Sequence, residues 1–484
     1  MTSLHDSHHA GTNHTDTDGL SRRSLLRASA LAGLGIGLSG TVGTLASPEA
    51  FADPSPAAGY GPVVADPRKL LALPRGFRYT VVAEAGVTRL TDGGEPTPSD
   101  TDGTACFPGP RNGYTLVNNH EIGGDEPHRV PNRPGLTYDP AGGGGTTNVD
   151  VGRDGTRIGE YVSVAGTHNN CAGGVTPWGT WLSCEETEAK AGTSGLTKDH
   201  GFVFEVSPRG AENPGNSPVP LKMLGRFSHE AVAVDPRNHT IYLTEDAAGP
   251  NGLLYRWIPP KGFHGATWAL KAIAEAPGGS TAGTFQAMRA TCDGRHVRDL
   301  SEATKVGTTY RVEWSDVPDR LAASVSTRKQ LPEDRITRSR KFEGAWWGDG
   351  GAYIVASYAR LDDGSVHPHD GQIWFYDPAK QTITLKVIFP VNTTPDQDGS
   401  NYDGPDNITV SPYGGVVVAE DGEGVQHLLG VDGAGRPYTM ARNDLNGSEF
   451  TGPNFSPDRA FLFAGIQSPG HVLAITGPWR STRG

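Results

Sequence analysis

A short motif recurs along this chain of 484 residues and constrains its fold more than any other feature. Each copy consists of a short apolar strand, a tight turn with Pro or Asp, and a second apolar strand. The copies lie at residues 104–121, 171–186, 230–246, 343–357, 406–421 and 451–466. One such unit is too small to bury its apolar face alone, so the units must pack against one another.

Six repeated sheets arranged around an axis form a β-propeller, and the sequence therefore predicts an all-β, six-bladed β-propeller. Third strands follow several copies, at residues 201–206, 252–257 and 427–431. The 66 Gly and 37 Pro residues suit the many turns of such a fold. A β-sandwich is the alternative architecture, although its strands do not recur as a fixed motif.

Helical periodicity is weak, so we expect only short helical insertions, with residues 289–306 as the best candidate. The interval 262–340, between the third and fourth copies, is longer than one blade and predicts an insertion over one face. We place the propeller domain at residues 104–484 and a separate N-terminal extension at residues 53–103.

Residues 1–52 have the pattern of a twin-arginine signal peptide. The run Ser21-Arg22-Arg23-Ser24-Leu25-Leu26 precedes a stretch of small and apolar residues, and Ala50-Phe51-Ala52 resembles a cleavage site. A membrane anchor is the alternative, but the stretch is barely long enough to span a bilayer. We therefore expect export by the twin-arginine machinery to an extracellular, periplasmic or cell-surface location, with no membrane span in the mature form.

Acids outnumber bases, 54 against 42, and the formal net charge is −12. Proteins that bind nucleic acids usually have a basic surplus, so we expect no nucleic-acid partner. The 9 Trp, 14 Tyr and 15 Phe residues supply the material of a core and argue against a disordered chain. The positions of the acids within the repeats are more informative than their number.

Alignment of the six copies on their turn residue places ligand-type side chains at one equivalent position. Six residues before the turn, the copies carry Thr104, Cys171, Glu230, Glu343, Asp406 and Thr451. Equivalent positions of the innermost strands of a propeller surround its axis. Four of these six side chains are of types that bind metal ions, and the sequence therefore predicts an axial metal site.

A second set of acids lies where the second strands of the copies end. It consists of Glu121 and the pairs Glu185-Glu186, Glu245-Asp246 and Glu420-Asp421. Carboxylates held close together repel one another and raise one another's pKa, and bound cations remove that cost. Oxygen ligands favour calcium, whereas the Cys171 thiolate favours iron or zinc, so the mixture predicts more than one kind of metal ion.

The cysteines Cys106, Cys171, Cys184 and Cys292 could form two disulfides in an exported protein, with three possible connectivities. Cys171 lies in the run 166–174, whose small residues allow a ligand or ion to approach closely. This context favours a functional thiolate at Cys171, and we expect the other three to be packed thiols.

The same residues lie in stretches that resemble the PhoX-type alkaline phosphatases. The most specific stretch is GTHNNCAGG at residues 166–174. The others are residues 118–121, 181–186, 225–231, 242–246, 342–344, 404–407 and 419–421. Together they extend from about residue 104 to about residue 470, nearly all of the mature chain.

The resemblance implies a six-bladed propeller that hydrolyses small phosphate monoesters with an axial cluster of iron (Fe³⁺) and calcium (Ca²⁺). By position, the residues that correspond to iron ligands are Cys171, Glu230 and Glu343. Those that correspond to the calcium side are Glu121, Glu186, Asp406, Glu420 and Asp421. The family is exported by the twin-arginine route, and we expect the mature protein to be a monomer.

The resemblance also suggests which side chains contact the substrate. A cationic side chain normally helps to hold the phosphoryl group that is transferred. The family commonly has Arg two residues before Glu343, and this chain has Lys341, which binds phosphate as a point charge. The other expected residues are Arg226 as a catalytic cation and Asn119, Asn170 and His229 as substrate-binding residues.

Two other functions are compatible with the repeat. A calcium-dependent lactonase or organophosphate hydrolase of the six-bladed type also has acids around an axial calcium ion, but it does not need Cys171. A non-catalytic propeller that binds a partner protein would depend on metal ions for its stability alone.

Overall fold

The structure is a computed structural model that describes residues 59–124, 126–209, 217–360, 367–397 and 402–480. Residues 56–484 form one compact unit. The predicted signal peptide, residues 1–52, lies outside the described residues. Among the residues that are described, no helix has the length and apolar character needed to cross a membrane.

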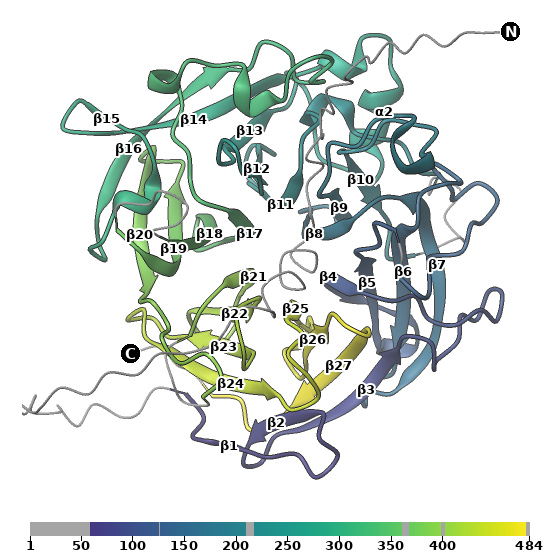
Figure 1. Cartoon of the computed structure of the whole chain (residues 1–484). Coiled ribbons are helices and arrows are strands. Elements are labelled where there is room, and N and C mark those ends of the chain that lie inside the picture. Colours follow the sequence, from purple (N-terminus) through teal and green to yellow (C-terminus); the bar gives the residue numbers. More distant parts are fainter. Residues whose placement is uncertain (1–58, 125, 210–216, 361–366, 398–401, 481–484) are drawn as a thin grey trace, which may run out of the picture. The chain divides into compact units, whose positions relative to one another are not determined.

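The described residues form an all-β propeller arrangement, in which five antiparallel sheets surround a common centre (Figure 1). One four-stranded sheet contains β4 (Thr101–Pro108), β5 (Tyr114–His120), β6 (Gly144–Val151) and β7 (Arg157–Thr167). A three-stranded sheet contains β8 (Asn170–Val175), β9 (Trp181–Glu185) and β10 (Val203–Val206). A second four-stranded sheet contains β25 (Phe450–Phe455), β26 (Leu462–Ile466), β27 (His471–Thr476) and β3 (Arg78–Glu84).

The two remaining sheets are larger. The six-stranded sheet contains β21 (Pro405–Val410), β22 (Val416–Glu420), β23 (His427–Val431), β24 (Pro437–Asn443), β2 (Leu71–Pro74) and β1 (Val63–Val64). The ten-stranded sheet begins with β11 (His229–Val234), β12 (Ile241–Glu245), β13 (Leu254–Ile258), β14 (Thr284–Cys292) and β15 (Arg295–Val297). It continues with β16 (Thr309–Asp316), β20 (Thr382–Phe389), β19 (His369–Asp377), β18 (Gly351–Ala359) and β17 (Phe342–Gly348).

The first strands of the six copies contact one another in turn around a closed ring near the centre of the sheets (Figure 1). They are β4, β8, β11, β17, β21 and β25. Each of these strands belongs to a different copy of the repeated motif, and the second strand of each copy pairs with it. The strand–turn–strand units that the sequence predicts are therefore present.

The predicted insertion at residues 262–340 contributes strands to the sheet. Its strand β14 pairs with β13, and its strand β16 pairs with β20, so two neighbouring repeats are joined edge to edge. The prediction of a helix at residues 289–306 is wrong, because these residues form the end of β14, then β15 and the short η6 (Leu300–Glu302). The unpaired edge of β13 provides backbone partners that a weak helical pattern cannot outweigh.

The insertion does contain the α-helix α2 (Ala269–Glu275). Short 3₁₀ helices lie in the connections: η1 (Pro110–Asn112), η2 (Thr193–Gly195), η4 (Lys222–Leu224), η5 (Gly279–Thr281), η7 (Thr327–Lys329) and η8 (Glu333–Arg335). The structure therefore has short helical insertions in a fold that is otherwise made of strands.

The segment expected to be a separate N-terminal extension is part of the sheets. Strand β3 pairs with β27, the last strand of the described chain, and β2 pairs with β24. Strands from the two ends of the described chain thus lie in the same sheets and hold the ring closed. The boundary predicted at residue 103 also falls inside β4, which begins at Thr101.

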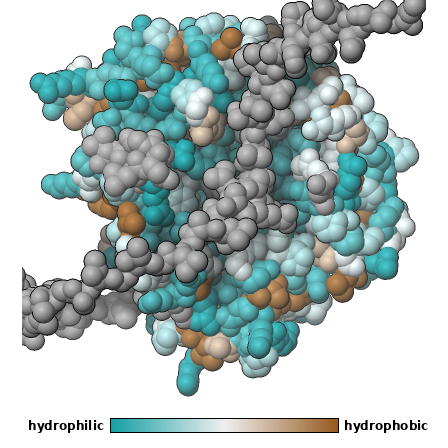
Figure 2. Space-filling model, in the orientation of Figure 1, coloured by the Kyte–Doolittle hydropathy of each residue, from teal (hydrophilic) through white to brown (hydrophobic). Residues whose placement is uncertain are grey.

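The core lies between neighbouring sheets. For example, Val417 and Leu428 of the six-stranded sheet pack against Leu462 and Leu473 of the sheet that contains β26. Strands β9, β12, β22 and β26 are buried along their whole length, as expected for strands covered on both faces. On the face seen in Figure 2, hydrophobic residues appear as small patches among hydrophilic ones.

Candidate metal centre

The six innermost strands share an irregularity near their beginning. In each of them, two residues lie opposite one residue of the neighbouring strand, as in a β-bulge. A bulge bends its strand and redirects a side chain. The first residues of the six bulges are Asp102, Cys171, Glu230, Glu343, Asp406 and Gly452.

The backbone register corrects two positions of the sequence alignment. In the first copy the residue equivalent to Cys171 is Asp102, two positions before the predicted Thr104. In the last copy it is Gly452, because Thr451 still pairs regularly with Gly465. Five of the six equivalent positions therefore carry an acid or a thiol.

In most of the six bulges the second residue is small, because neighbouring backbones approach closely there. A Cβ atom on Gly103 would lie 2.7 Å from the Cα atom of Ala172, and one on Gly344 would lie 2.7 Å from the carbonyl oxygen of Asp406. A cavity of about 20 Å³ is lined by residues of all six innermost strands, including Gly103 and Gly344. An acid or thiol followed by Gly or Ala is the sequence signal that would have located Asp102.

The bulge residues meet acids from the strand ends in three groups, in each of which the ligand atoms lie within 4.8 Å of one another. The groups are Cys171 with Glu186 and Glu230, Glu230 with Glu343 and Asp406, and Asp406 with Asp421 and Glu449. Because Glu230 and Asp406 are each shared by two groups, the three groups form one continuous cluster, which we call the acidic cluster.

The electrostatics of the acidic cluster favour bound cations. Burial, and then the charges of Asp406, Glu186 and Glu343, raise the pKa of Glu230 well above its ordinary value. Burial and neighbouring carboxylates raise the pKa values of Asp102 and Glu186 in the same way. Among the described residues, the Oδ1 atom of Asp102 is buried with no hydrogen-bond donor. Bound cations would allow these carboxylates to ionise.

The donor set fits two classes of metal ion. Cys171 is a free, buried cysteine, and burial together with Glu230 and Glu186 raises the pKa of its thiol well above the ordinary value. A transition metal would favour the thiolate, whereas the groups made only of carboxylates suit a hard ion such as calcium. The donor types therefore agree with the mixture that the sequence predicts.

Lys341 lies at the edge of the acidic cluster. Its Nζ atom is 2.5 Å from Oδ2 of Asp246 and 3.2 Å from Oε1 of Glu343. The hydroxyl group of Ser357 also donates a hydrogen bond of 2.7 Å to Glu343. Lys341 thus brings a positive charge to the place where the sequence predicts a cationic side chain.

Two amides bond to Glu121, and one of them also reaches Asp102. Asn169 donates a 3.0 Å hydrogen bond from Nδ2 to Glu121. Gln467 donates hydrogen bonds from Nε2 to Glu121 at 2.7 Å and to Asp102 at 3.3 Å. Sequence reasoning missed Asn169, Glu449 and Gln467, since none of them occupies the ligand position of the aligned repeat.

In the acid pairs at the strand ends, the first and the second acid have different surroundings. Glu420, expected as a metal ligand, accepts hydrogen bonds from the backbone N–H groups of Asp403 and His427 and from the His427 ring, and belongs to none of the three groups. Glu245 likewise accepts bonds from Leu253, Tyr255 and Arg328. Adjacent residues of a strand point to opposite sides, so only the second acid of each pair faces the cluster.

Both asparagines that were predicted to bind substrate are buried and form hydrogen bonds within the sheets. Asn119 donates to the carbonyl oxygens of Cys171 and Ala172, at 2.7 and 2.8 Å, and accepts from Trp181 and Ser183. It therefore supports the backbone of Cys171. Asn170 is bonded to Thr167 and Ser183, while its neighbour Asn169 is the asparagine that reaches the cluster.

The other two predicted contacts are also buried and outside the three groups. The ring of His229 stacks on Phe227 with centroids 3.6 Å apart, and burial lowers its pKa to about 3, which keeps it neutral. Arg226 donates from Nη2 to the carbonyl oxygens of Glu188 and Ala189 and so holds the segment that follows Glu186. Both side chains support the surrounding structure.

All four cysteines are free, so neither of the two possible disulfides forms. Cys106 and Cys184 are packed thiols, as expected. Cys292 is exposed at the end of β14, contrary to that expectation.

One family model matches most of the chain. The family model described as "Alkaline phosphatase PhoX" matches residues 58–160 and 155–470. No protein with a curated description matches the chain.

Among solved structures, Pseudomonas fluorescens PhoX in complex with vanadate, a transition state analogue, is similar with a TM-score of 0.64 and 18% identity. The match covers 87% of this chain and 98% of that chain. A gluconolactonase from Xanthomonas campestris matches with a TM-score of 0.43 and 13% identity, over 87% of this chain and 98% of that chain.

Proposed function

The chain belongs to the PhoX family of alkaline phosphatases and is a phosphoric ester hydrolase; we propose that its acidic cluster holds the iron and calcium ions of a phosphate monoesterase. The observation that carries this proposal is the convergence of Cys171 with Glu186 and Glu230, next to two further groups of carboxylates. A buried cluster of carboxylates must either take up protons or bind cations, and bound cations allow its carboxylates to stay ionised at neutral pH.

We assign the metal positions by donor type. The group with the thiol, Cys171 with Glu186 and Glu230, and the adjoining Glu343 would hold iron. The group of Asp406, Asp421 and Glu449 would hold calcium, with Glu121 and Asp102 nearby. Relative to the sequence-based assignment, Glu186 moves from the calcium side to the iron group, Glu420 leaves the ligand set, and Asp102 and Glu449 join it.

When bound, such ions stabilise charge on phosphate oxygens and activate water for attack on phosphorus. The residues of this chain prepare the site for that chemistry. Gln467 and Asn169 orient Glu121. Glu343 is oriented by Ser357 and Lys341, and Asn119 fixes the backbone of Cys171. Lys341 adds a positive charge that would attract a phosphoryl oxygen.

Replacement of Lys341 by methionine is expected to lower kcat/KM for a phosphate monoester by roughly 100-fold, because the substitution removes one positively charged donor from the site. Lys341→Arg should retain much more of the activity. The measurement is the steady-state turnover of p-nitrophenyl phosphate, together with the metal content of each variant.

The matched control is Lys271→Met, which removes a buried lysine of α2 that donates hydrogen bonds to Ser217. This variant should keep full activity. If Lys341→Met lost its metal ions rather than its turnover per bound metal, Lys341 would act only as a counter-ion for Asp246 and Glu343.

We further infer that the propeller has six blades, with the ten-stranded sheet divided between two of them. The closed ring of six innermost strands and the six bulges support this count. In this description β11 to β14 form one blade and β16 to β20 the next, and the hairpin from the insertion joins their outer edges.

We also propose that residues 1–52 direct export of the folded protein by the twin-arginine route. The double arginine at Arg22 and Arg23 and the small-residue stretch that follows support this assignment. Export after folding would allow metal ions to be bound in the cytoplasm, where their supply is controlled.

The decisive experiment is elemental analysis of protein collected outside the cytoplasm of a twin-arginine-competent host, with p-nitrophenyl phosphate turnover before and after chelation. Iron and calcium, with turnover that chelators abolish, are the expected result. Metal-free protein that still turns over the ester would refute the metal assignment, and absence of the protein outside the cytoplasm would refute the export assignment.

A further inference from the structure

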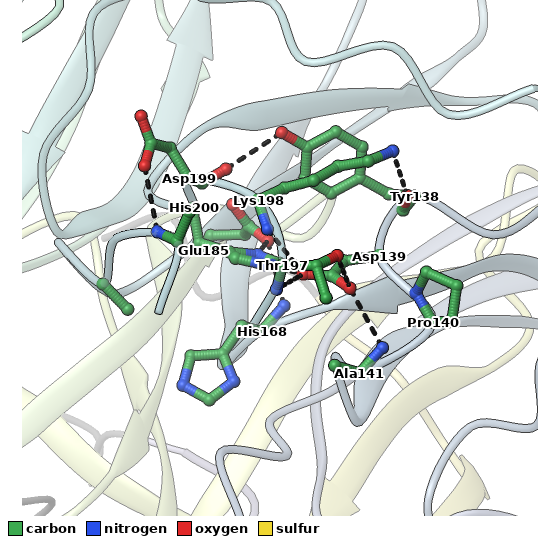
Figure 3. Close-up of polar contacts among 12 residues, drawn as sticks. Tyr138, Asp139, Pro140, Ala141, His168, Glu185, Thr197, Lys198, Asp199 and His200 are labelled. Atoms are coloured by element: carbon green, nitrogen blue, oxygen red, sulfur yellow. Dashed lines mark hydrogen bonds and ion pairs between the residues drawn. The ribbon is translucent and has the colours of Figure 1, made fainter. Parts of the chain in front are cut away.

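A chain of buried polar side chains contacts Glu185, the residue that precedes Glu186. His200 bridges two carboxylates, with Nδ1 2.6 Å from Oε1 of Glu185 and Nε2 3.4 Å from Oδ2 of Asp139 (Figure 3). All three side chains are fully buried. We call Glu185, His200 and Asp139 the Glu185 relay.

Glu185 is held from several directions at once. Its Oε1 atom accepts from the backbone N–H of His168 at 2.9 Å as well as from His200. Its Oε2 atom accepts from the backbone N–H groups of Gly201 at 2.8 Å and Phe202 at 3.0 Å. Together these hydrogen bonds fix the orientation of the Glu185 carboxylate at the end of β9.

Asp139 anchors the far end of the relay. It accepts hydrogen bonds from the backbone N–H groups of Thr197 at 2.6 Å, Lys198 at 2.9 Å and Ala141 at 3.0 Å, and from the Thr197 hydroxyl at 2.7 Å (Figure 3). Burial would lower the pKa of His200, but its hydrogen bonds to Glu185 and Asp139 raise the pKa above the ordinary value. A protonated imidazole ring can donate from both nitrogens, one toward each carboxylate.

The position of the relay relative to Glu186 suggests what it does. Glu186 follows Glu185 directly, its backbone N–H donates to Asn169, and its carboxylate belongs to the group with Cys171 and Glu230. We propose that His200 and Asp139 are positioning residues that act through Glu185 to aim Glu186 at this group and so set its metal affinity. This inference rests on the proposed metal function of the acidic cluster.

The same device recurs at another strand end. Glu420, at the end of β22, accepts from the backbone and the ring of His427, and the next residue, Asp421, belongs to the group with Asp406 and Glu449. Replacing a buried ion pair with apolar residues is often neutral or stabilising, so fold stability alone does not explain these pairs. Both pairs lie one residue before an acid of the cluster, and this shared position is consistent with a role in orienting that acid.

The test uses the full chain, stripped of metal by a chelator and titrated with Co²⁺, with the cobalt–thiolate charge-transfer absorption as the signal for binding at Cys171. His200→Ala should bind Co²⁺ roughly 10- to 100-fold more weakly, the range seen when partners of ligating residues are lost. His200→Gln should recover part of the affinity because its amide can donate one hydrogen bond to Glu185. Asp139→Asn, which keeps an acceptor for the backbone, should also weaken binding.

The matched control is His471→Gln, which removes a buried histidine beside Glu84 in the outer pair of strands β27 and β3. It should leave the Co²⁺ affinity unchanged, and thermal unfolding of every metal-free variant reports any general loss of stability. Unchanged affinity in the His200 variants, or an equal loss in His471→Gln, would overturn the inference. If the unsubstituted protein gave no cobalt–thiolate signal, the metal group itself would be refuted.

Discussion

Cys171→Ala is expected to abolish binding of the transition metal and to lower phosphatase turnover by at least about 100-fold, since loss of a direct ligand exceeds loss of an outer partner. Cys171 supplies the sulfur of the only cysteine-containing group found among the described residues. Its buried thiol has a pKa well above the ordinary value without metal, so a bound cation must stabilise the thiolate. Elemental analysis and p-nitrophenyl phosphate turnover measure the two effects.

The control for this variant is Cys184→Ala, which makes the same change at a free, fully buried cysteine of the same sheet. It should keep its metal ions and its activity, with at most a small loss of stability. Full activity of Cys171→Ala would instead favour a propeller hydrolase that uses calcium alone, the alternative that does not need this thiol.

The metal-free protein is expected to lose stability as the pH rises, whereas the metal-loaded protein is not. Burial and neighbouring carboxylates raise the pKa values of Asp102, Glu186 and Glu230 in the folded, metal-free state. Above about pH 4.5, the ordinary value for an acid, the folded state therefore holds protons that the unfolded chain has released. The free energy of unfolding then falls with pH until the raised pKa values are passed.

The size of the effect follows from the shifts. Each unit by which a folded-state pKa exceeds the unfolded value costs about 1.4 kcal/mol once both states are ionised. Thermal unfolding of chelated protein at about pH 5 and about pH 8 should show the higher midpoint at the lower pH. With metal ions bound the carboxylates are ionised and compensated, and this dependence should disappear.

Glu230→Gln provides a sharper form of the same experiment, because it removes one buried negative charge from the acidic cluster. The metal-free variant should be more stable than the unsubstituted metal-free protein at the higher pH. Glu313→Gln, at an exposed acid paired with Arg289, should show no such gain. A metal-free protein whose stability rises with pH over this range would contradict the electrostatic account of the cluster.

The repeated motif was sufficient to predict the strands near the centre and most of the acidic cluster. Cys171, Glu230, Glu343 and Asp406 were predicted from an alignment of turns, and they lie at equivalent bulges in the structure. This succeeded because the alternation of apolar residues and the chemistry of turns are local properties of the chain. These residues lie within the part of the chain that the family model matches.

Other features of the site were not predicted, because they depend on strand register and on side-chain contacts that the aligned repeat does not specify. Asp102 and Gly452 occupy the ligand position because the strand register differs from the alignment of the turns in these two copies. Glu449 joins Asp406 and Asp421 from a connection outside the ligand position of the aligned repeat. The direction of Glu420, toward His427 and away from the cluster, depends on a partner seven residues away across a hairpin.

The sequence by itself determined the chemistry available to this protein: a repeated sheet, one thiol among acids, and a lysine beside them. The tertiary structure decided which of these side chains meet. It inserted β14 and β16 between two repeats, and it closed the ring with β2 and β3 from the other end of the described chain. The physical reason is that side-chain type and periodicity are local, whereas convergence on an axis arises only when sheets from the whole chain pack together.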